Sequence, residues 1–149
     1  MKKFQKLALG LTLAVATAMP AAANDAAMCK TYGKFGGAMV DFMLPLTMQN
    51  FVDMMTGQKP ELLSEMTQSL LTYLDGTDLY NMAQMDGDES DLLGEAAGGV
   101  AIELLMSGRA TNDQEVITLM EDACLKVGID AIIDNQRIAN KAEAQNLGE

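Results

Sequence analysis

Apolar residues recur at helical spacing along almost the whole chain after residue 24. Between residues 60 and 75, for example, Leu63, Met66, Leu70 and Leu74 follow one another at intervals that place them on one helix face. Alternating runs of β-branched or aromatic residues, which indicate strands, do not occur. The pattern therefore predicts an all-α fold, a compact bundle of about four to six helices.

Prolines and glycines indicate where these helices begin and end. A first helical segment over 26–56 is expected to kink or split at Pro45 and to stop at Gly57. Pro60 begins the next helix in a favoured first-turn position, and Asp75-Gly76 closes it. Three more helices are expected: one over 78–85, before a turn at Asp86-Gly87-Asp88, one from Ser90 or Asp91 to Met106, and one from Asn112 or Asp113 to about Asn135 or beyond. A polar tail from 141 is expected to fray.

Ala96-Ala97-Gly98-Gly99, in the middle of one expected helix, has almost no side-chain bulk. Two glycines in a helix interior cost about 2 kcal/mol relative to alanine. Close approach of another backbone is the usual compensation, and Gly36-Gly37 on the first helix is the expected partner.

The first 23 residues follow the pattern of a secretory signal peptide. Three lysines precede an apolar stretch from Leu7 to Met19, and Ala21 and Ala23 satisfy the small-x-small cleavage rule. An uncleaved membrane anchor is the weaker alternative, because this apolar stretch is shorter than the roughly 20 apolar residues that a membrane-spanning helix needs. The expected organisation is a signal peptide over 1–23 and one helical domain over 24–149, located in the periplasm.

Without residues 1–23 the net charge of the chain is more negative. Three of the ten basic residues lie within this segment and none of the 21 acidic ones, which leaves seven against 21 and a net charge of −14. Such a chain repels nucleic-acid phosphates and anionic lipid surfaces. Cations or basic proteins are the natural partners, although excess negative charge that only maintains solubility stays an open alternative.

The chain contains two cysteines, Cys29 and Cys124. Each lies on an apolar stripe of helical spacing, and an exported protein meets an oxidising compartment. We therefore expect one structural disulfide that joins the first and last helices, worth about 4 to 5 kcal/mol in the chain-entropy model. Redox catalysis is not expected, because no Cys-x-x-Cys pair is present.

Catalytic and metal-binding motifs are scarce. The chain has no histidine, which excludes Ser-His-Asp and Cys-His chemistry and most zinc sites, so neither an enzyme, a cofactor nor a metal is expected. Asp86, Asp88 and Ser90 are similar to the start of a calcium loop, but Asp91 replaces the required glycine and Ala97 the bidentate glutamate. The methionine pairs, which could bind copper(I) as thioethers, are better explained as filling of core gaps; they are Met54-Met55 and Met82-x-x-Met85.

Charge distribution is the most informative feature. Between Lys59 and Arg109 no basic residue occurs, while ten acids do. Acidic groups attract a basic partner, and tyrosine is enriched where binding energy concentrates. A solvated acidic loop is the alternative. The predicted partner-binding residues are Tyr80, Asp86, Asp88, Glu89 and Asp91.

The profile over 24–149, with its signal, the Cys29 and Cys124 pair, helices and acidic face, resembles the periplasmic immunity proteins of type VI secretion systems. That resemblance implies an inhibitor that occludes a basic, lysozyme- or amidase-like peptidoglycan hydrolase. The chain also resembles, less closely, the HdeA-type acid-stress chaperones, although its cysteines are much further apart than in that group. The second resemblance implies dimers that open at low pH, and a homodimer is compatible with the methionine-rich helices without being required.

Overall fold

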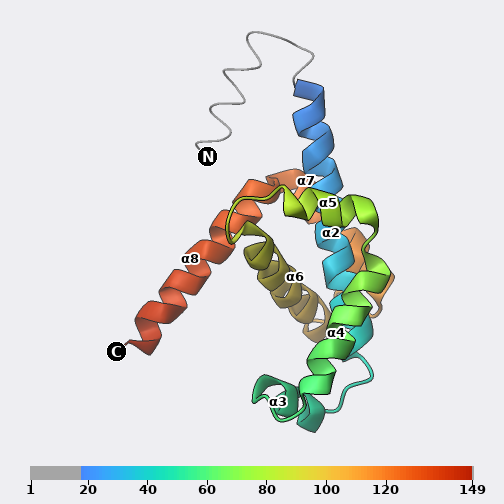
Figure 1. Cartoon of the computed structure of the whole chain (residues 1–149), viewed down its shortest axis with the longest axis vertical. Coiled ribbons are helices and arrows are strands. Elements are labelled where there is room, and N and C mark those ends of the chain that lie inside the picture. The colour runs from blue at the N-terminus through green and yellow to red at the C-terminus, as the bar shows by residue number, and fades with distance from the viewer. Residues whose placement is uncertain (1–17, 149) are drawn as a thin grey trace.

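Figure 1 shows a computed structural model of the chain, which describes residues 18–148 and, within them, the side chains of residues 25–148. The described part is all-helical, without strands, so the predicted all-α fold is confirmed. It contains seven helices, more than the expected four to six. The helices are α2 (Ala18–Met43), α3 (Met48–Met55), α4 (Pro60–Tyr73), α5 (Gly76–Ala83), α6 (Glu89–Met106), α7 (Asp113–Val127) and α8 (Ile129–Leu147).

The predicted signal peptide lies mostly in residues 1–17, outside the described residues. Helix α2 begins at Ala18, so the expected cleavage point after Ala23 falls within its first two turns. Cleavage and export therefore stay predictions.

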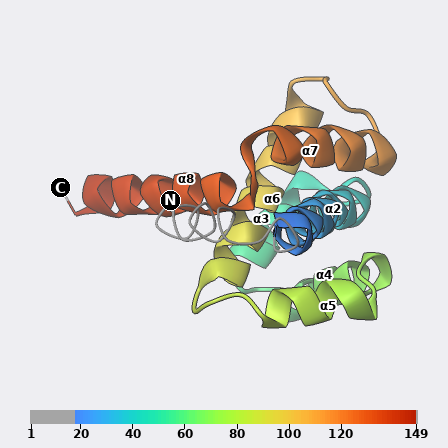
Figure 2. The ribbon, with the colours of Figure 1, turned by 90° about the horizontal axis from the view of Figure 1, so that it is seen from above.

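Helix α2 is the central element of the fold. Seen from above, it lies between α7 on one side and α4 and α5 on the other (Figure 2), and α6 packs against it as well. Between residues 29 and 40 only Lys30 is exposed. A helix that is apolar on nearly all sides belongs in the interior, which explains its central position.

The main core lies where α2, α6 and α7 meet. Leu93, Val116 and Met120 are fully buried in it, and burial of each such side chain contributes about 1.5 to 3 kcal/mol. This core holds the three helices in one unit and supports α6 along most of its length.

A second, smaller core joins α3 and α4 to the end of α2. It consists of Phe42, Met54 and Leu62, one residue from each helix. The sequence pattern placed Leu63 on the buried face of α4, but Leu63 is 46% exposed and Leu62 is buried. The helical period alone did not reveal that the first turn of α4 also packs against α3. Because of this second contact, Leu62 rather than Leu63 is the buried residue of that turn.

The helix boundaries follow the local signals closely. The break between α2 and α3 lies at Pro45, as predicted, and Pro60 is the first residue of α4. Gly57 and Gly87 have φ values of 74° and 54°, a left-handed conformation that glycine adopts without steric cost. Their turns follow α3 and precede α6, which confirms the expected stops.

Cys29 of α2 and Cys124 of α7 form a disulfide with their Cα atoms 5.4 Å apart, so the predicted pairing is confirmed. Both residues are fully buried. The expected position of Cys124 on the last helix is wrong, because α7 is followed by α8.

Gly128 divides the segment that was expected to be one last helix. Its φ of 86° interrupts the helix between α7 and α8. The backbone N–H of Ile129 donates to Asp25 Oδ1 at 3.3 Å, so a side chain from α2 supplies the first turn of α8 with an acceptor. Helix α8 then leaves the bundle and continues to Leu147, through the tail that was expected to fray (Figure 1).

The glycines of α2 allow close approach of α7, and the expected pairing with the glycines of α6 is wrong. A Cβ on Gly33 would lie 2.8 Å from the carbonyl oxygen of Ile117, and one on Gly36 would lie 2.1 Å from Met120 Sδ. On α6, by contrast, a Cβ on Gly99 would meet nothing within 4 Å. The disulfide brings α7, rather than α6, to this face of α2.

Gly33→Ala and Gly99→Ala therefore have opposite expected effects. Gly33→Ala should lower the free energy of unfolding by about 1 to 3 kcal/mol, because a backbone oxygen of α7 must move. Gly99→Ala should raise it by about 0.5 to 1 kcal/mol through helix propensity alone. Urea denaturation of both variants checks the pair, and equal stability of the two would contradict the close α2–α7 approach.

Candidate functional site

The acidic corner is the surface formed by the five residues predicted to bind a partner. Tyr80 lies on α5 and is 65% exposed. The four acids follow in the α5–α6 turn and the first turn of α6. Three of them are exposed and Glu89 is half-buried. The corner consists of Tyr80, Asp86, Asp88, Glu89 and Asp91.

A hollow of about 440 Å³ lies beside this corner, between α5 and the start of α8. Its charged lining residues, Glu89 and Asp130, are both acidic, and Tyr80 stands among its polar residues. The hollow therefore suits a cationic side chain that has some apolar length, such as arginine or lysine. The lining comprises Met28, Tyr80, Asn81, Gln84, Met85, Glu89, Ile129, Asp130 and Ile133.

Part of the negative charge in the corner serves α6 itself. The Asp86 N–H donates to Glu89 Oε2 at 3.2 Å. Glu89 and Asp91 lie in the first turn of α6, where acidic side chains interact favourably with the helix dipole. A structural role for these two carboxylates therefore stands beside any role in binding.

Helix α8 brings its own charges to the corner. Arg137 lies 3.5 Å from Asp88 and 3.1 Å from Asp134. Asn140 Nδ2 donates to Glu95 Oε2 at 2.6 Å, which joins α8 to α6. The corner is thus less negative at Asp88 than its sequence indicates.

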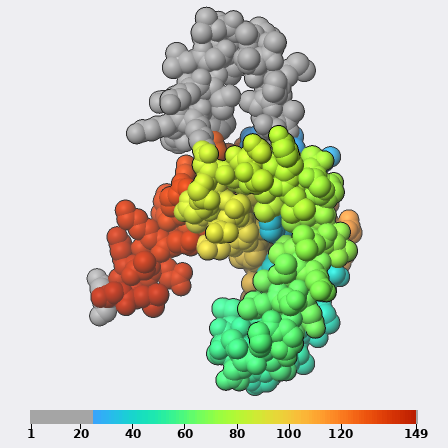
Figure 3. Space-filling view, in the orientation of Figure 1, coloured from blue at the N-terminus to red at the C-terminus, as the bar shows by residue number. Residues whose placement is uncertain are grey.

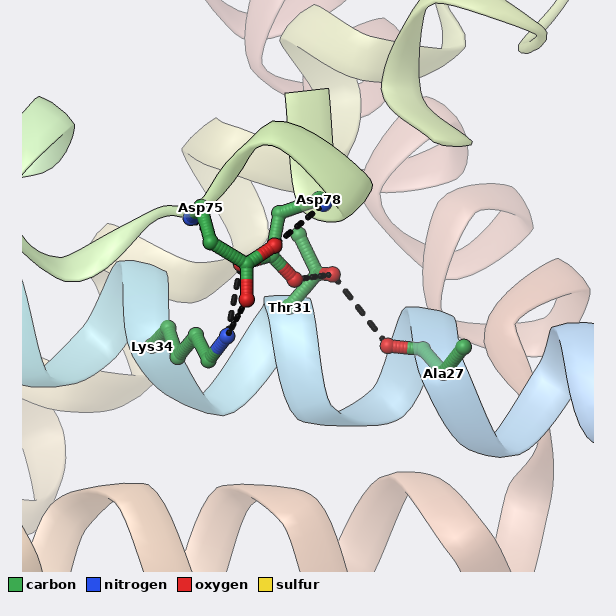
Figure 4. A network of polar contacts seen from close by, with 5 residues as sticks. All are labelled: Ala27, Thr31, Lys34, Asp75 and Asp78. Carbon is green, nitrogen blue, oxygen red and sulfur yellow. Dashed lines mark hydrogen bonds and ion pairs between the residues drawn. The ribbon is translucent and has the colours of Figure 1, made fainter. Parts of the chain in front are cut away.

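Asp75 and Asp78, two of the ten acids between Lys59 and Arg109, form a network of polar contacts with α2 (Figure 4). Asp78 is only 5% exposed. Its carboxylate accepts hydrogen bonds from Thr31 Oγ1 and Lys34 Nζ, both at 2.6 Å. It also accepts from the Asp75 N–H at 2.8 Å, and Asp75 accepts in return from the Asp78 N–H, which makes a capping box at the start of α5. Asp78 therefore attaches α5, with Tyr80, to the central helix.

The environment of Asp78 favours its charged form. Burial raises the pKa of its carboxyl, but the hydrogen bonds from Lys34, Thr31 and the Asp75 backbone outweigh burial and lower the pKa below its ordinary value of 3.8. Asp78 is consequently a structural anion and not a group that exchanges protons near neutral pH.

Tyr73, the other tyrosine between Lys59 and Arg109, is half-buried and makes its hydrogen bond within the fold. Its hydroxyl donates to Asp113 Oδ2 at 2.6 Å, which joins the end of α4 to the start of α7. This hydrogen bond lowers the pKa of the Asp113 carboxyl, while burial and the same contact raise the pKa of Tyr73 well above its ordinary value of 10.0. Tyr80 is therefore the tyrosine of this stretch that a partner can reach.

Within the described residues no three His, Cys, Asp or Glu side chains lie close enough together to hold a metal ion. The methionines of the first candidate copper pair separate, because Met54 is buried and Met55 is 70% exposed. The second pair, Met82 and Met85, packs partly buried against the main core.

Sequence reasoning missed the contribution of α8 to this site. Asp130 lines the hollow and Arg137 lies beside Asp88, and both follow the break at Gly128. A local signal for that break was present, because Lys126 in a last helical turn followed by Gly128 is typical of a helix end. The direction that α8 takes after the break had no such signal.

No match was found for this chain among protein-family models, curated proteins or solved structures. In the part of the chain that the structure describes, no helix is both long and apolar enough to span a membrane.

Proposed function

We propose that this protein is an exported, non-enzymatic inhibitor that protects its producer by occluding a basic, peptidoglycan-degrading enzyme of the lysozyme or amidase type. The observation that carries the proposal is the hollow beside the acidic corner. An exposed tyrosine, Tyr80, stands there among polar residues, and the charged lining residues are both acidic. Immunity proteins of type VI secretion systems, which the chain resembles in profile, act by such occlusion.

The chemistry of the hollow favours a cationic side chain of the partner. A basic side chain donates charge-assisted hydrogen bonds to carboxylates such as those of Glu89 and Asp130, which line the hollow, and such bonds are about twice as strong as neutral ones. Tyr80 adds contact area and an aromatic face that attracts arginine or lysine. The net charge of −14 for residues 24–149 also increases the rate at which a basic enzyme arrives.

The first experiment captures partners from extracellular and periplasmic fractions of the producing strain with the disulfide-intact protein, residues 24–149. We expect one stoichiometric cell-wall hydrolase whose digestion of purified peptidoglycan stops when the protein is added. Recovery of weakly held, unrelated proteins, with no hydrolase inhibited, would reject the proposal.

Tyr80→Ala is expected to weaken binding to this hydrolase by about 30-fold, the effect of losing an aromatic hot spot. The double reversal Asp86→Lys/Asp91→Lys should mainly slow association and reduce its dependence on salt. Surface plasmon resonance at two salt concentrations measures both effects. The matched control is Glu61→Lys/Glu65→Lys, which makes the same charge change at exposed positions of α4 and should leave the Tyr80 contact unaffected.

A second candidate, the HdeA-type acid-stress chaperone, is favoured by one specific observation. The attachment of α5 to α2 depends on the buried carboxylate of Asp78, which acid would neutralise. This candidate predicts that the protein suppresses aggregation of unrelated proteins at about pH 2 to 3 and not at pH 7.

A further inference from the structure

The side of the molecule seen in Figure 3 is hollowed between α8 and the part formed by α3 and α4. Helix α6 passes along this side, and two hollows lie against it. One, of about 340 Å³, lies between α6 and α8; the other, of about 250 Å³, lies between α6, α3 and the end of α2. Glu103 lines the first hollow and Met106 the second, so the two hollows lie within one turn of each other along α6, although no residue lines both. We call these two hollows together the α6 groove.

The end of the groove at α3 is apolar and rich in methionine. Met48 is 79% exposed and Met106 is 85% exposed, although both side chains are apolar. Met43 and Phe51 line the same hollow. Exposed methionines that surround a hollow are typical of binding surfaces that adapt to an apolar partner.

The exposed stripe of α6 is acidic and contains a glycine. Asp91, Glu95, Gly99 and Glu103 are all exposed and follow one another at intervals of four residues, on one face of the helix. Gly99 has no close neighbour within the described residues, so nothing in the fold compensates the low helix propensity of glycine at this position. The missing side chain leaves room for the backbone of a partner to approach α6.

Charge decides which partner the groove suits. Neither hollow has a lysine or arginine among its lining residues. A row of carboxylates along one helix attracts basic side chains of a helix that packs beside it. A second copy of this chain, also at −14 for residues 24–149, and an anionic membrane would both be repelled.

We propose that the α6 groove binds a cationic amphipathic helix of a partner protein. Basic residues of that helix pair with the α6 stripe, and its apolar end enters the methionine-lined hollow. The length of α6 from Asp91, where the stripe begins, to Met106, in the methionine-lined hollow, matches a partner helix of about 15 residues at 1.5 Å per residue. The inference rests on the proposed function only in taking the partner to be a basic protein. The hollows of the groove share no lining residue with the hollow beside Tyr80, while Asp91 belongs both to the acidic corner and to the α6 stripe.

The test uses a synthetic, fluorescein-labelled 18-residue peptide of lysine and leucine arranged as an amphipathic helix, with a scrambled peptide of the same composition. We expect saturable binding of the first peptide to the disulfide-intact protein, measured by fluorescence anisotropy, and binding of the scrambled peptide that is weaker by about tenfold. Met48→Glu/Met106→Glu should raise the dissociation constant by about tenfold or more. Leu125→Glu, at a 53% exposed position of α7 that lines neither hollow, should change it by less than about twofold.

The variant Gly99→Leu tests whether a loss of peptide binding comes from a blocked groove or from a less stable protein. The added side chain projects into open space, so the variant should be at least as stable as the wild type, yet it should weaken peptide binding by about tenfold through steric exclusion.

The inference would be overturned by equal binding of the scrambled peptide, by equal effects of the groove and α7 variants, or by a homodimer that Met106→Glu abolishes. Comparable binding to anionic vesicles would assign the groove to a lipid and also overturn it. Because the peptide replaces the natural partner, these failures are distinct from a failure to inhibit the captured hydrolase.

Discussion

Replacing both cysteines, Cys29→Ala and Cys124→Ala, is expected to lower the free energy of unfolding by about 4 to 5 kcal/mol. The two residues are 95 positions apart, so the bridge restricts most of the unfolded chain. A domain of this size is stable by only about 5 to 15 kcal/mol, and the variant should therefore be partly unfolded at 37 °C. Equilibrium denaturation in guanidinium chloride, followed by circular dichroism, measures the change.

Reduced wild-type protein is the natural control for this experiment. It keeps both sulfur atoms in the core, so it separates loss of the cross-link from loss of the buried side-chain volume. We expect the reduced protein to account for most of the destabilisation. A double variant within about 1 kcal/mol of the oxidised wild type would mean that the packing of α2 on α7 suffices without the bridge.

Asp78→Ala has the second-largest expected effect, a loss of about 2 to 4 kcal/mol. The substitution leaves Lys34 without its closest carboxylate and removes the partner of the buried Thr31 hydroxyl. The loss is smaller than for a fully buried pair, because the Lys34 side chain is 28% exposed and remains 3.5 Å from Asp75. Urea denaturation measures it, and we expect α5 to lose protection from hydrogen exchange before the main core does.

Asp75→Ala is the matched control, three residues away on the same turn. Its side chain is 64% exposed, so its removal should cost only about 1 kcal/mol, the usual value for a helix cap. If both variants lost the same stability, the network would act as a helix cap alone and not as an attachment of α5 to α2.

The Asp78 carboxylate makes the free energy of unfolding depend on pH, and the direction of this dependence follows from its pKa. The pKa of Asp78 is lower in the folded protein than its ordinary value of 3.8. Its contribution to stability is therefore fully present above about pH 5 and is lost as the pH falls below about 4 and through the folded pKa. Asp78→Asn should flatten this part of the stability profile. Binding of a hydrophobic dye at pH 3 by the wild type would favour the chaperone candidate, and its absence would favour the inhibitor.

Much of the helix pattern could be predicted from the sequence, because the signals that begin and end helices act over a few residues. The breaks at Pro45, Gly57 and Gly87 and the start at Pro60 are of this kind. The disulfide was predictable for a similar reason, since two cysteines on apolar stripes have only each other as partners.

Asp75 and Asp78 lie three positions apart and have different roles, which no local signal in the sequence distinguishes. Asp75 is exposed and Asp78 is buried, because α5 docks on α2 with only Asp78 facing Thr31. Tyr73 and Tyr80 differ in the same way, since only Tyr73 meets Asp113 from α7. Of the acidic corner, the sequence located the residues but not the hollow beside them, which Asp130 of α8 helps to line.

The sequence by itself determined that this protein is helical, where most of its helices end and which cysteines pair. Only the tertiary structure decided that the α2 glycines face α7, that Gly128 directs α8 to the acidic corner and that Gly99 stays uncovered. The physical reason is that helix formation depends on neighbours within about four residues, whereas the faces that helices present to one another depend on contacts between distant segments.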